Sequence, residues 1–280
     1  MAYLTRVPAG KSTFALALAI LASAAPTALQ SASVSPMAVY LDGRNRQGTM
    51  TLYNPGTRPE EIRIDFAFGY PQSDDEGNLS VPLYDEAPQG EPSAVPWLTA
   101  FPRRMVLQPG QRQVVRIVAR PPPGLEEGEY WGRALVHSKG GVPPIEAGRQ
   151  GVDVKIDVET VVVVAVNYRN GEVSTGLEVS SAAAALVPDS TVATIDLART
   201  GNAAFLGRLL VEALDDQGAV LGEREEVLAV YRTLRRRVAI PVPSGAVPAR
   251  VRYTMDTHRD DLPDRGVIPT EPVVFEIQPK

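Results

Sequence analysis

The sequence predicts an all-β protein made of two consecutive immunoglobulin-like β-sandwich domains. Short apolar segments with period-two alternation recur along the chain, and a run of about seven of them starts again after Gly171. The 25 prolines and 23 glycines are spread over the 280 residues, as expected where turns join many short strands. With 44% hydrophobic residues and no cysteine, each domain must be stabilised by an apolar core.

Residues 1–32 have the three-part layout of a secretory signal peptide. Arg6 and Lys11 precede an apolar run over residues 14–25, which is too short to span a bilayer as a permanent helix. Small and polar residues follow, and we expect cleavage between about residues 25 and 33. A retained membrane anchor is the alternative. The chain is therefore expected to be exported.

The first domain is predicted over residues 33–168. Its expected strands cover residues 34–41, 47–53, 60–68, 104–107, 113–120 and 131–137, followed by a long last strand ending at Val166. The segment 69–96 is rich in Pro, Gly, Asp and Glu, and we expect an extended surface excursion. Tyr130 follows a Gly-containing corner, which is typical of a tyrosine corner whose hydroxyl group bonds to upstream backbone.

The second domain is predicted over residues 169–280. Its expected strands cover residues 173–180, 192–200, 205–214, 220–230, 234–240, 250–255 and 273–277. A short alanine-rich stretch at 182–186 is a candidate helical turn, although it is too short to form a stable helix by itself. Arg235, Arg236 and Arg237 fall within one expected strand, so at least one of them must point inward or pair with a carboxylate.

The segment from Gly151 to Val166 is the most informative about function. Every even position from 152 to 166 is apolar except Thr160, and the odd positions change from charged residues to apolar ones at Val161. Alternation indicates a strand with one apolar face, and an apolar run on both sides indicates a strand buried on both sides. If the first half lies at a sheet edge, it offers unpaired backbone groups and apolar side chains to another chain. A central core strand is the alternative.

Composition argues against several other functions. The net charge of −5 gives no electrostatic basis for binding nucleic acid. Without cysteine, thiolate zinc sites and thiol nucleophiles are excluded. His137 and His258 lie in different domains without the spacing of a metal pair, and we expect both in solvated turns. No nucleophile, base and acid can be assembled, so neither an enzyme nor a cofactor is expected.

Several stretches of the chain are informative through their order and spacing: SPMAVY (35–40), TLYNPG (51–56), FPRRMVLQPGQ (101–111) followed by QVVR (113–116), GEY (128–130), YR (168–169) and RTGN (199–202). Together they resemble the PapD-like periplasmic chaperones of pilus assembly. The resemblance implies a periplasmic chaperone that caps incomplete immunoglobulin-like pilus or fimbrial subunits by donor-strand complementation. It also implies delivery of the subunit to an outer-membrane usher.

On this resemblance, the donor strand that binds the subunit comprises Val152, Val154, Ile156, Val158, Val162 and Val164. Members of the family also grip the subunit's terminal carboxylate with two basic residues. The matching positions fall near Met37 and Val161, which are not basic, so Lys155 and Arg149 are the candidate substitutes. An exposed apolar edge strand is further expected to let two copies of the protein associate. Two rival interpretations stand: an exported structural or adhesion module that lends no strand, and a degraded hydrolase or sugar-binding sandwich with its site near Trp97.

Overall fold

The computed structural model describes residues 31–141, 145–149, 152–156 and 158–280. The predicted signal peptide lies outside the described residues except for Ser31 and Ala32. Within them the regular secondary structure is β-strand, apart from two short 3-10 turns, η1 (Val95–Trp97) and η2 (Asp264–Gly266), and there is no α-helix. No helix in this part of the chain is long and apolar enough to cross a membrane. The predicted all-β class is confirmed.

The first sandwich consists of two facing sheets. One has the strand order β1 (Ser33–Ser35), β3 (Gln47–Tyr53), β9 (Arg112–Ala119), β7 (Leu98–Phe101). The other has the order β2 (Ala38–Asp42), β13 (Glu159–Asn170), β10 (Gly128–Lys139), β4 (Glu60–Ala67), β8 (Arg104–Leu107). Alternate residues of both sheets form the core between them, including the fully buried Leu52, Ile64, Ile117, Val136 and Val164.

The first strand of the chain changes sheets. The sequence predicts one strand over residues 34–41, but the structure breaks it at Pro36 and Met37. Before the break β1 pairs antiparallel with β3, and after it β2 pairs parallel with β13. Proline has no N–H group to donate to a ladder, which favours a change of partner at this point.

The second sandwich has the same kind of architecture. One sheet has the order β14 (Thr175–Val187), β15 (Ser190–Gly201), β18 (Thr233–Pro241), and the other β17 (Val220–Val230), β16 (Phe205–Leu214), β19 (Arg250–Asp256), β20 (Val273–Ile277). The alanine-rich stretch 182–186 belongs to β14 rather than to a helical turn, because it pairs with β15 and places Ala184 in the core. The hydroxyl group of Tyr253 donates to the Ala183 carbonyl oxygen at 2.8 Å across this core.

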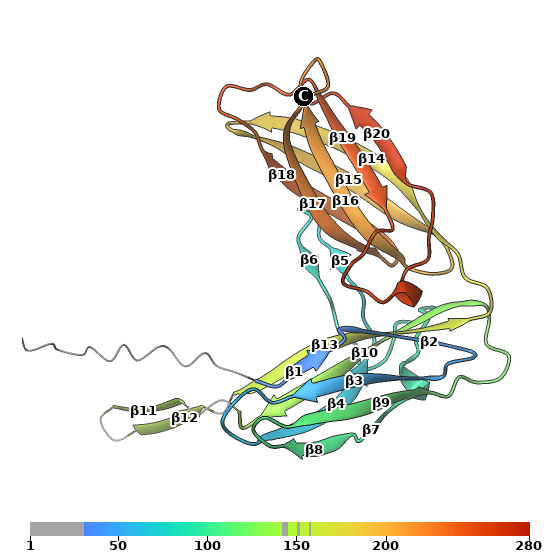
Figure 1. Cartoon of the computed structure of the whole chain (residues 1–280), viewed down its shortest axis with the longest axis vertical. Helices are drawn as coiled ribbons and strands as arrows, with labels where there is room; N and C mark the ends of the chain where they lie inside the picture. Colours follow the sequence, from blue (N-terminus) through green and yellow to red (C-terminus); the bar gives the residue numbers. More distant parts are fainter. Residues whose placement is uncertain (1–30, 142–144, 150–151, 157) are drawn as a thin grey trace, which may run out of the picture.

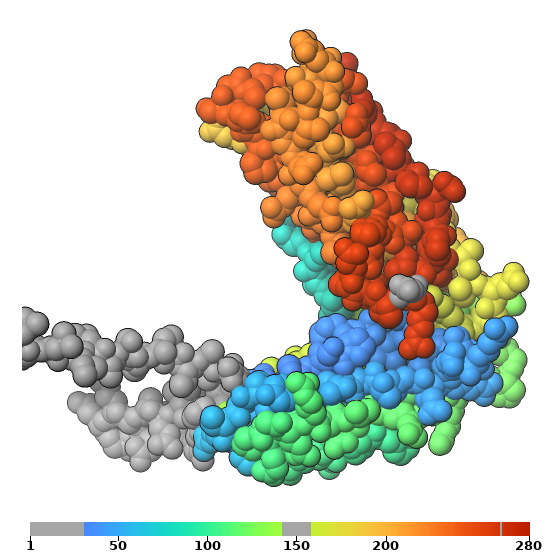
Figure 2. All heavy atoms as spheres, viewed as in Figure 1, coloured from blue at the N-terminus to red at the C-terminus, as the bar shows by residue number. Residues whose placement is uncertain are grey.

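A third apolar cluster joins the two sandwiches. The first sandwich contributes Phe68, Tyr70 and Trp131, and the second contributes Leu206 and Tyr231. The Tyr231 ring lies 4.9 Å from that of Trp131 and 5.6 Å from that of Tyr70, measured between ring centroids. The sandwiches meet at one end of each, so the molecule is bent and has a concave side (Figures 1 and 2).

A hairpin of the first domain reaches the second. Strands β5 (Gln72–Ser73) and β6 (Leu79–Ser80) pair with each other and extend toward β18, as Figure 1 shows. The Arg235 amide donates to Ser73 Oγ at 2.7 Å, and Arg236 Nη1 donates to the Gly77 carbonyl oxygen at 3.0 Å. The sequence predicted only a surface excursion here, whereas the hairpin is a contact between the domains.

The arginine run on β18 is paired as the sequence required. Arg235 forms a bidentate ion pair with Asp196, with Nε to Oδ1 at 2.6 Å and Nη2 to Oδ2 at 2.8 Å. Arg236 pairs with Glu226. Hydrogen bonds from Arg235 and from Ser181 lower the pKa of Asp196 to about 2. These carboxylates hold the guanidinium groups that contact the hairpin.

Candidate functional site

Strand β13 is paired on both sides over only part of its length. Along one side β10 pairs with all of it, from Glu159 to Asn170. Along the other side the register of β2 covers only Ala165 to Arg169. In the described part of the chain, residues 159–164 therefore form an edge of the sheet that no strand covers.

The free backbone groups of this edge can be assigned. The Ala165 amide donates to the Met37 carbonyl oxygen at 3.0 Å, so the backbone of Ala165 faces the β2 side. In an antiparallel ladder the backbone groups of successive residues point alternately to the two sides of the strand. The N–H and C=O groups of Val161 and Val163 therefore point away from β10, toward the free edge. They are positioned to pair with an added strand.

The side chains of β13 divide between two faces. Val164 is fully buried, and Val162 packs against the same core of the first sandwich. Val161, by contrast, is 43% exposed, and Val163, which lies opposite Leu135 of β10, is partly exposed. The predicted subunit-binding residues Val162 and Val164 thus fill the protein's own core, and the outward apolar face of this edge is formed by Val161 and Val163.

The other predicted donor residues lie in a separate hairpin. Val152, Val154 and Ile156 belong to β12 (Val152–Ile156), which pairs antiparallel with β11 (Ile145–Arg149). The segment predicted as one strand is therefore two strands, and Val158 lies outside both. Figure 1 shows the hairpin beyond the ends of β10 and β13, away from the second sandwich.

The two candidate carboxylate anchors lie in the same hairpin. Lys155 is on β12 opposite Glu146, and Arg149 is the last residue of β11, opposite Val152. The structure places both on backbone beyond the sandwich, and it does not describe their side chains. Their role therefore stays a prediction.

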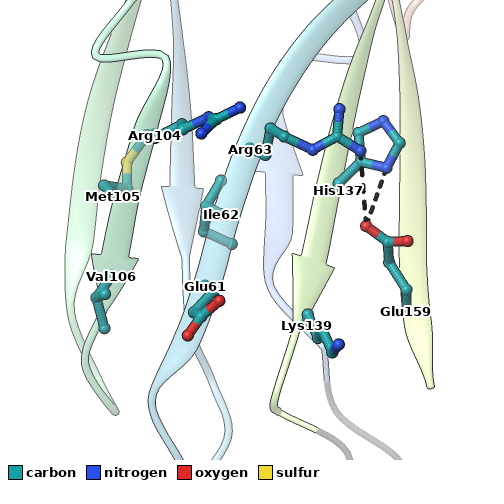
Figure 3. A pocket seen from close by; sticks show the side chains of 9 residues that line it. All are labelled: Glu61, Ile62, Arg63, Arg104, Met105, Val106, His137, Lys139 and Glu159. Carbon is teal, nitrogen blue, oxygen red and sulfur yellow. Dashed lines mark hydrogen bonds and ion pairs between the residues drawn. The ribbon is translucent and has the colours of Figure 1, made fainter. Parts of the chain in front are cut away.

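A charged cluster fixes the beginning of the free edge. Figure 3 shows Glu159 of β13 directed toward His137 of β10 and Arg63 of β4. Glu159 Oε1 lies 3.1 Å from His137 Nδ1 and 3.9 Å from Arg63 Nη2. Asp65 Oδ2 lies 3.6 Å from His137 Nε2, so the imidazole ring sits between two carboxylates. The expectation of a solvated turn is wrong for His137, because it lies within β10 with its side chain only 17% exposed.

The surface beside this cluster is a shallow depression of about 520 Å³. Figure 3 shows its lining from four neighbouring strands: Glu61, Ile62, Arg63, Arg104, Met105, Val106, His137, Lys139 and Glu159. Within the described residues, no group of three or more His, Asp or Glu side chains is arranged to hold a metal ion.

The other end of β13 is locked to the second sandwich. Arg169 Nε donates to Glu129 Oε2 at 2.8 Å, while Nη1 and Nη2 donate to the carbonyl oxygens of Arg265 and Gly266, each at 2.7 Å. Glu129 is itself buried, and its Oε1 accepts from the amide of Ala204 at 3.2 Å. This network joins β13 to the second sandwich at the end opposite the free edge.

Side chains that sequence reasoning missed line the junction of β2 and β13. A small cavity of about 180 Å³ opens there beside Met37 and Ala165. Arg133, which is 6% exposed, donates from Nε to the Gly69 carbonyl oxygen at 2.8 Å and stacks on Tyr231 at 5.3 Å. Burial, reinforced by nearby Tyr231 and Glu129, raises the pKa of Tyr40 in the same region. Arg133, Tyr231 and Tyr40 are far apart in the sequence, so no local pattern indicated that these side chains would lie together.

The tyrosine corner predicted from the sequence is confirmed. The Tyr130 hydroxyl group donates to the Glu126 carbonyl oxygen at 3.0 Å, four residues upstream. Tyr130 also packs edge-on against Trp97, at 6.1 Å between ring centroids. The corner thereby fixes the start of β10, which supports β13 along its full length.

Comparison with known proteins gives structural similarities only. No protein-family model and no curated protein sequence matches the chain. The CsuC–CsuE chaperone–tip adhesion subunit pre-assembly complex from the archaic chaperone–usher Csu pili of Acinetobacter baumannii matches at 10% identity and TM-score 0.44, covering 89% of this chain and 99% of that one. The Salmonella enterica SafA pilin–SafB chaperone complex matches at 11% identity and TM-score 0.43, covering 89% and 97%. The Pseudomonas aeruginosa CupB2 chaperone matches at 12% identity and TM-score 0.42, covering 89% and 100%.

Proposed function

We propose that this protein is a periplasmic chaperone, a divergent PapD-like member, that caps incomplete immunoglobulin-like pilus subunits by donating a strand. The observation that carries the proposal is the uncovered edge of β13 at residues 159–164. A subunit that lacks one strand exposes unpaired backbone and an apolar groove. The free edge offers the complementary backbone groups, and its outward face offers Val161 and Val163.

The interaction would be β-augmentation. Main-chain hydrogen bonds along the edge supply affinity for any extended partner, and the side chains that enter its groove supply specificity. Fully burying a valine side chain contributes roughly 1.5–3 kcal/mol. Val161 is already more than half buried, so the edge alone offers only part of that amount for each residue. We therefore include Val152, Val154 and Ile156 of β12 in the proposed donor strand, together with the free edge.

The bent shape supports the same function. The network around Arg169 and the aromatic cluster around Tyr231 hold the two sandwiches at a fixed angle. A subunit on the concave side could contact both domains while it pairs with β13 (Figure 2). The subunit would stay on the chaperone until an outer-membrane usher takes it over.

Co-expression with a pilus subunit encoded beside this chain tests the proposal. We expect the subunit to co-purify from the periplasm with the unaltered protein. Val161→Asp should greatly reduce recovery, because it places a charge on the apolar edge. Val161→Pro should do the same by removing an N–H group that faces the edge.

Val106→Asp is the matched control. Val106 is 53% exposed and lies on β8, at the opposite edge of the same sheet. This variant should recover the subunit normally. Equal recovery with Val161→Asp, Val161→Pro and Val106→Asp, all folded by circular dichroism, would contradict strand donation and favour a structural or adhesion module.

A further inference from the structure

A buried carboxylate at the start of β4 lies against the first described residues of the chain. Glu60 is completely buried. Its Oε2 accepts a hydrogen bond from the Ala32 amide at 2.8 Å and another from the Ser138 hydroxyl group. Its Oε1 is buried without a hydrogen-bond partner. In the described part of the chain, these two donors are the partners of the carboxylate, and neither carries a positive charge.

The surroundings leave little room for a cationic side chain. The backbone at Gly141 packs directly on the carboxyl group, since a Cβ atom there would lie 2.6 Å from Glu60 Cδ. Burying an ionised carboxylate without a cation is costly, and an amide N–H needs only a neutral acceptor. A glutamate at position 60 is therefore expected if the Ala32 nitrogen that it contacts carries a positive charge.

The position of Ala32 makes such a charge available. In the sequence, the apolar run over residues 14–25 is followed by the segment 26–30 and then by the small residues Ser31, Ala32 and Ser33. A signal peptidase cuts directly after a small residue. A cut after Ser31 meets this requirement and leaves Leu29 at the third position before the bond. Cleavage of the bond between Ser31 and Ala32 would convert the nitrogen that already donates to Glu60 into a free amino group.

We propose that the mature protein begins at Ala32 and that Glu60 is the buried counter-ion of its α-ammonium group. In this step a signal peptidase hydrolyses the Ser31–Ala32 peptide bond with one water molecule. Ser31 leaves with the new carboxylate, and Ala32 keeps the nitrogen, which takes up a proton at neutral pH. The ammonium group then offers further N–H donors to the carboxyl group whose Oε1 has no partner. The inference rests on the proposed export and is independent of strand donation.

The processing is tested by the mass of the exported protein. The full chain is produced in a Gram-negative host, and the periplasmic fraction is examined by intact mass and by sequencing of the N-terminal peptide. We expect a chain that begins at Ala32. A chain that begins elsewhere, for instance at Ala25 after the triplet Ala22-Ser23-Ala24, would overturn the inference while leaving export intact. An unprocessed chain in the cytoplasm would overturn export as well.

The role of Glu60 is tested by a double-mutant cycle. Chains that begin at Ala32 and at Ser31 are released from a cleavable fusion, each with Glu60 or with Glu60→Gln. In the Ser31 chain the Ala32 nitrogen is again an amide, so it serves as the matched control. We expect the Ala32 chain to unfold at a temperature at least about 2 °C higher when Glu60 is present. We expect most of this difference to disappear with Glu60→Gln.

Three results would overturn the assignment of Glu60. The first is an equal unfolding temperature for the Ala32 and Ser31 chains with Glu60 in place. The second is the same difference in both backgrounds, since the ammonium group would then act without Glu60. The third is a more stable Ser31 chain. If Glu60→Gln does not fold in either chain, the comparison of the two chains with Glu60 in place still decides the question.

Discussion

Replacement of Tyr231 by alanine tests whether the aromatic cluster couples the two sandwiches. Tyr231 is only 3% exposed, and its ring contacts Trp131, Tyr70 and the Arg133 guanidinium group. Truncating a buried aromatic side chain to alanine typically costs about 3–5 kcal/mol. Aromatic pairs of this kind add about 0.5–1.5 kcal/mol each beyond the buried area. We therefore expect Tyr231→Ala to lower the free energy of unfolding by about 3–5 kcal/mol, mostly through lost contacts between the two sandwiches.

Urea unfolding followed by two probes measures this effect. Both tryptophans, Trp97 and Trp131, lie in the first domain, and Trp131 lies in the cluster itself. In Tyr231→Ala, the native fluorescence should shift to the red as Trp131 gains water. The fluorescence transition should also separate from the circular dichroism transition, because the sandwiches then unfold independently.

The control is Tyr53→Ala. The Tyr53 ring is partly exposed at the end of β3 and has Arg112 stacked on it at 4.4 Å. This change should cost much less and leave the two transitions coincident. The reasoning is refuted if Tyr231→Ala loses less than about 1 kcal/mol while both probes stay coincident.

Three further predictions concern the second sandwich. Hydrogen bonds from Arg235 lower the pKa of Asp196 to about 2 in the folded protein, whereas the pKa of an unfolded aspartate is about 3.9. The ionised carboxylate therefore stabilises the fold fully above the unfolded pKa. This stabilisation is lost as the pH falls through the folded pKa. Asp196→Asn should thus lower the unfolding temperature at neutral pH, and the difference from the unaltered protein should narrow as the pH falls from about 5 to about 3; a constant difference would contradict this. Arg235→Ala should speed proteolysis within residues 74–78, because the hairpin loses the hydrogen bond from Arg235 Nη1 to the Asp75 carbonyl oxygen. An unchanged digestion pattern would count against this contact. Gly207→Ala should destabilise the protein by about 1–3 kcal/mol in urea unfolding, because the added Cβ atom would clash with the Asp256 carbonyl oxygen. Gly43→Ala, where the added Cβ atom meets open space, should change the stability by no more than about 0.5 kcal/mol.

Local alternation was sufficient to predict most strands. The expected strand at 205–214 matches β16, and the one at 60–68 matches β4 to within one residue. The tyrosine corner at Tyr130 was predictable because it depends on a corner four residues away in the chain. Such features depend on neighbours in sequence, which the sequence displays directly.

The junction between the domains could not be predicted in the same way. Tyr70 and Tyr231 are far apart in the chain and belong to segments that had no regular pattern at their positions. Their contact depends on the path of the hairpin and on the angle between the sandwiches. The sequence shows that these aromatic residues exist, and only the three-dimensional arrangement shows that they stack.

The segment 151–166 was predicted in part. Alternation correctly indicated a strand with an apolar face, but it could not indicate which core that face would fill. For Val162 and Val164 it is the protein's own core. The break between β12 and β13 was also hidden, because the alternation continues through it while the pairing with β11 does not. The assignment of the remaining donor residues stays a prediction.

The parallel strand β2 sets a limit on any guest strand. Beyond Val164 the place beside β13 is taken by Met37 and the residues that follow it. A guest strand that pairs with the free edge of β13 must therefore end at Val164, where β2 blocks it. Sliding by one residue would turn every guest side chain to the opposite face. The point at which β2 begins therefore sets the register in which a guest strand can pair with β13.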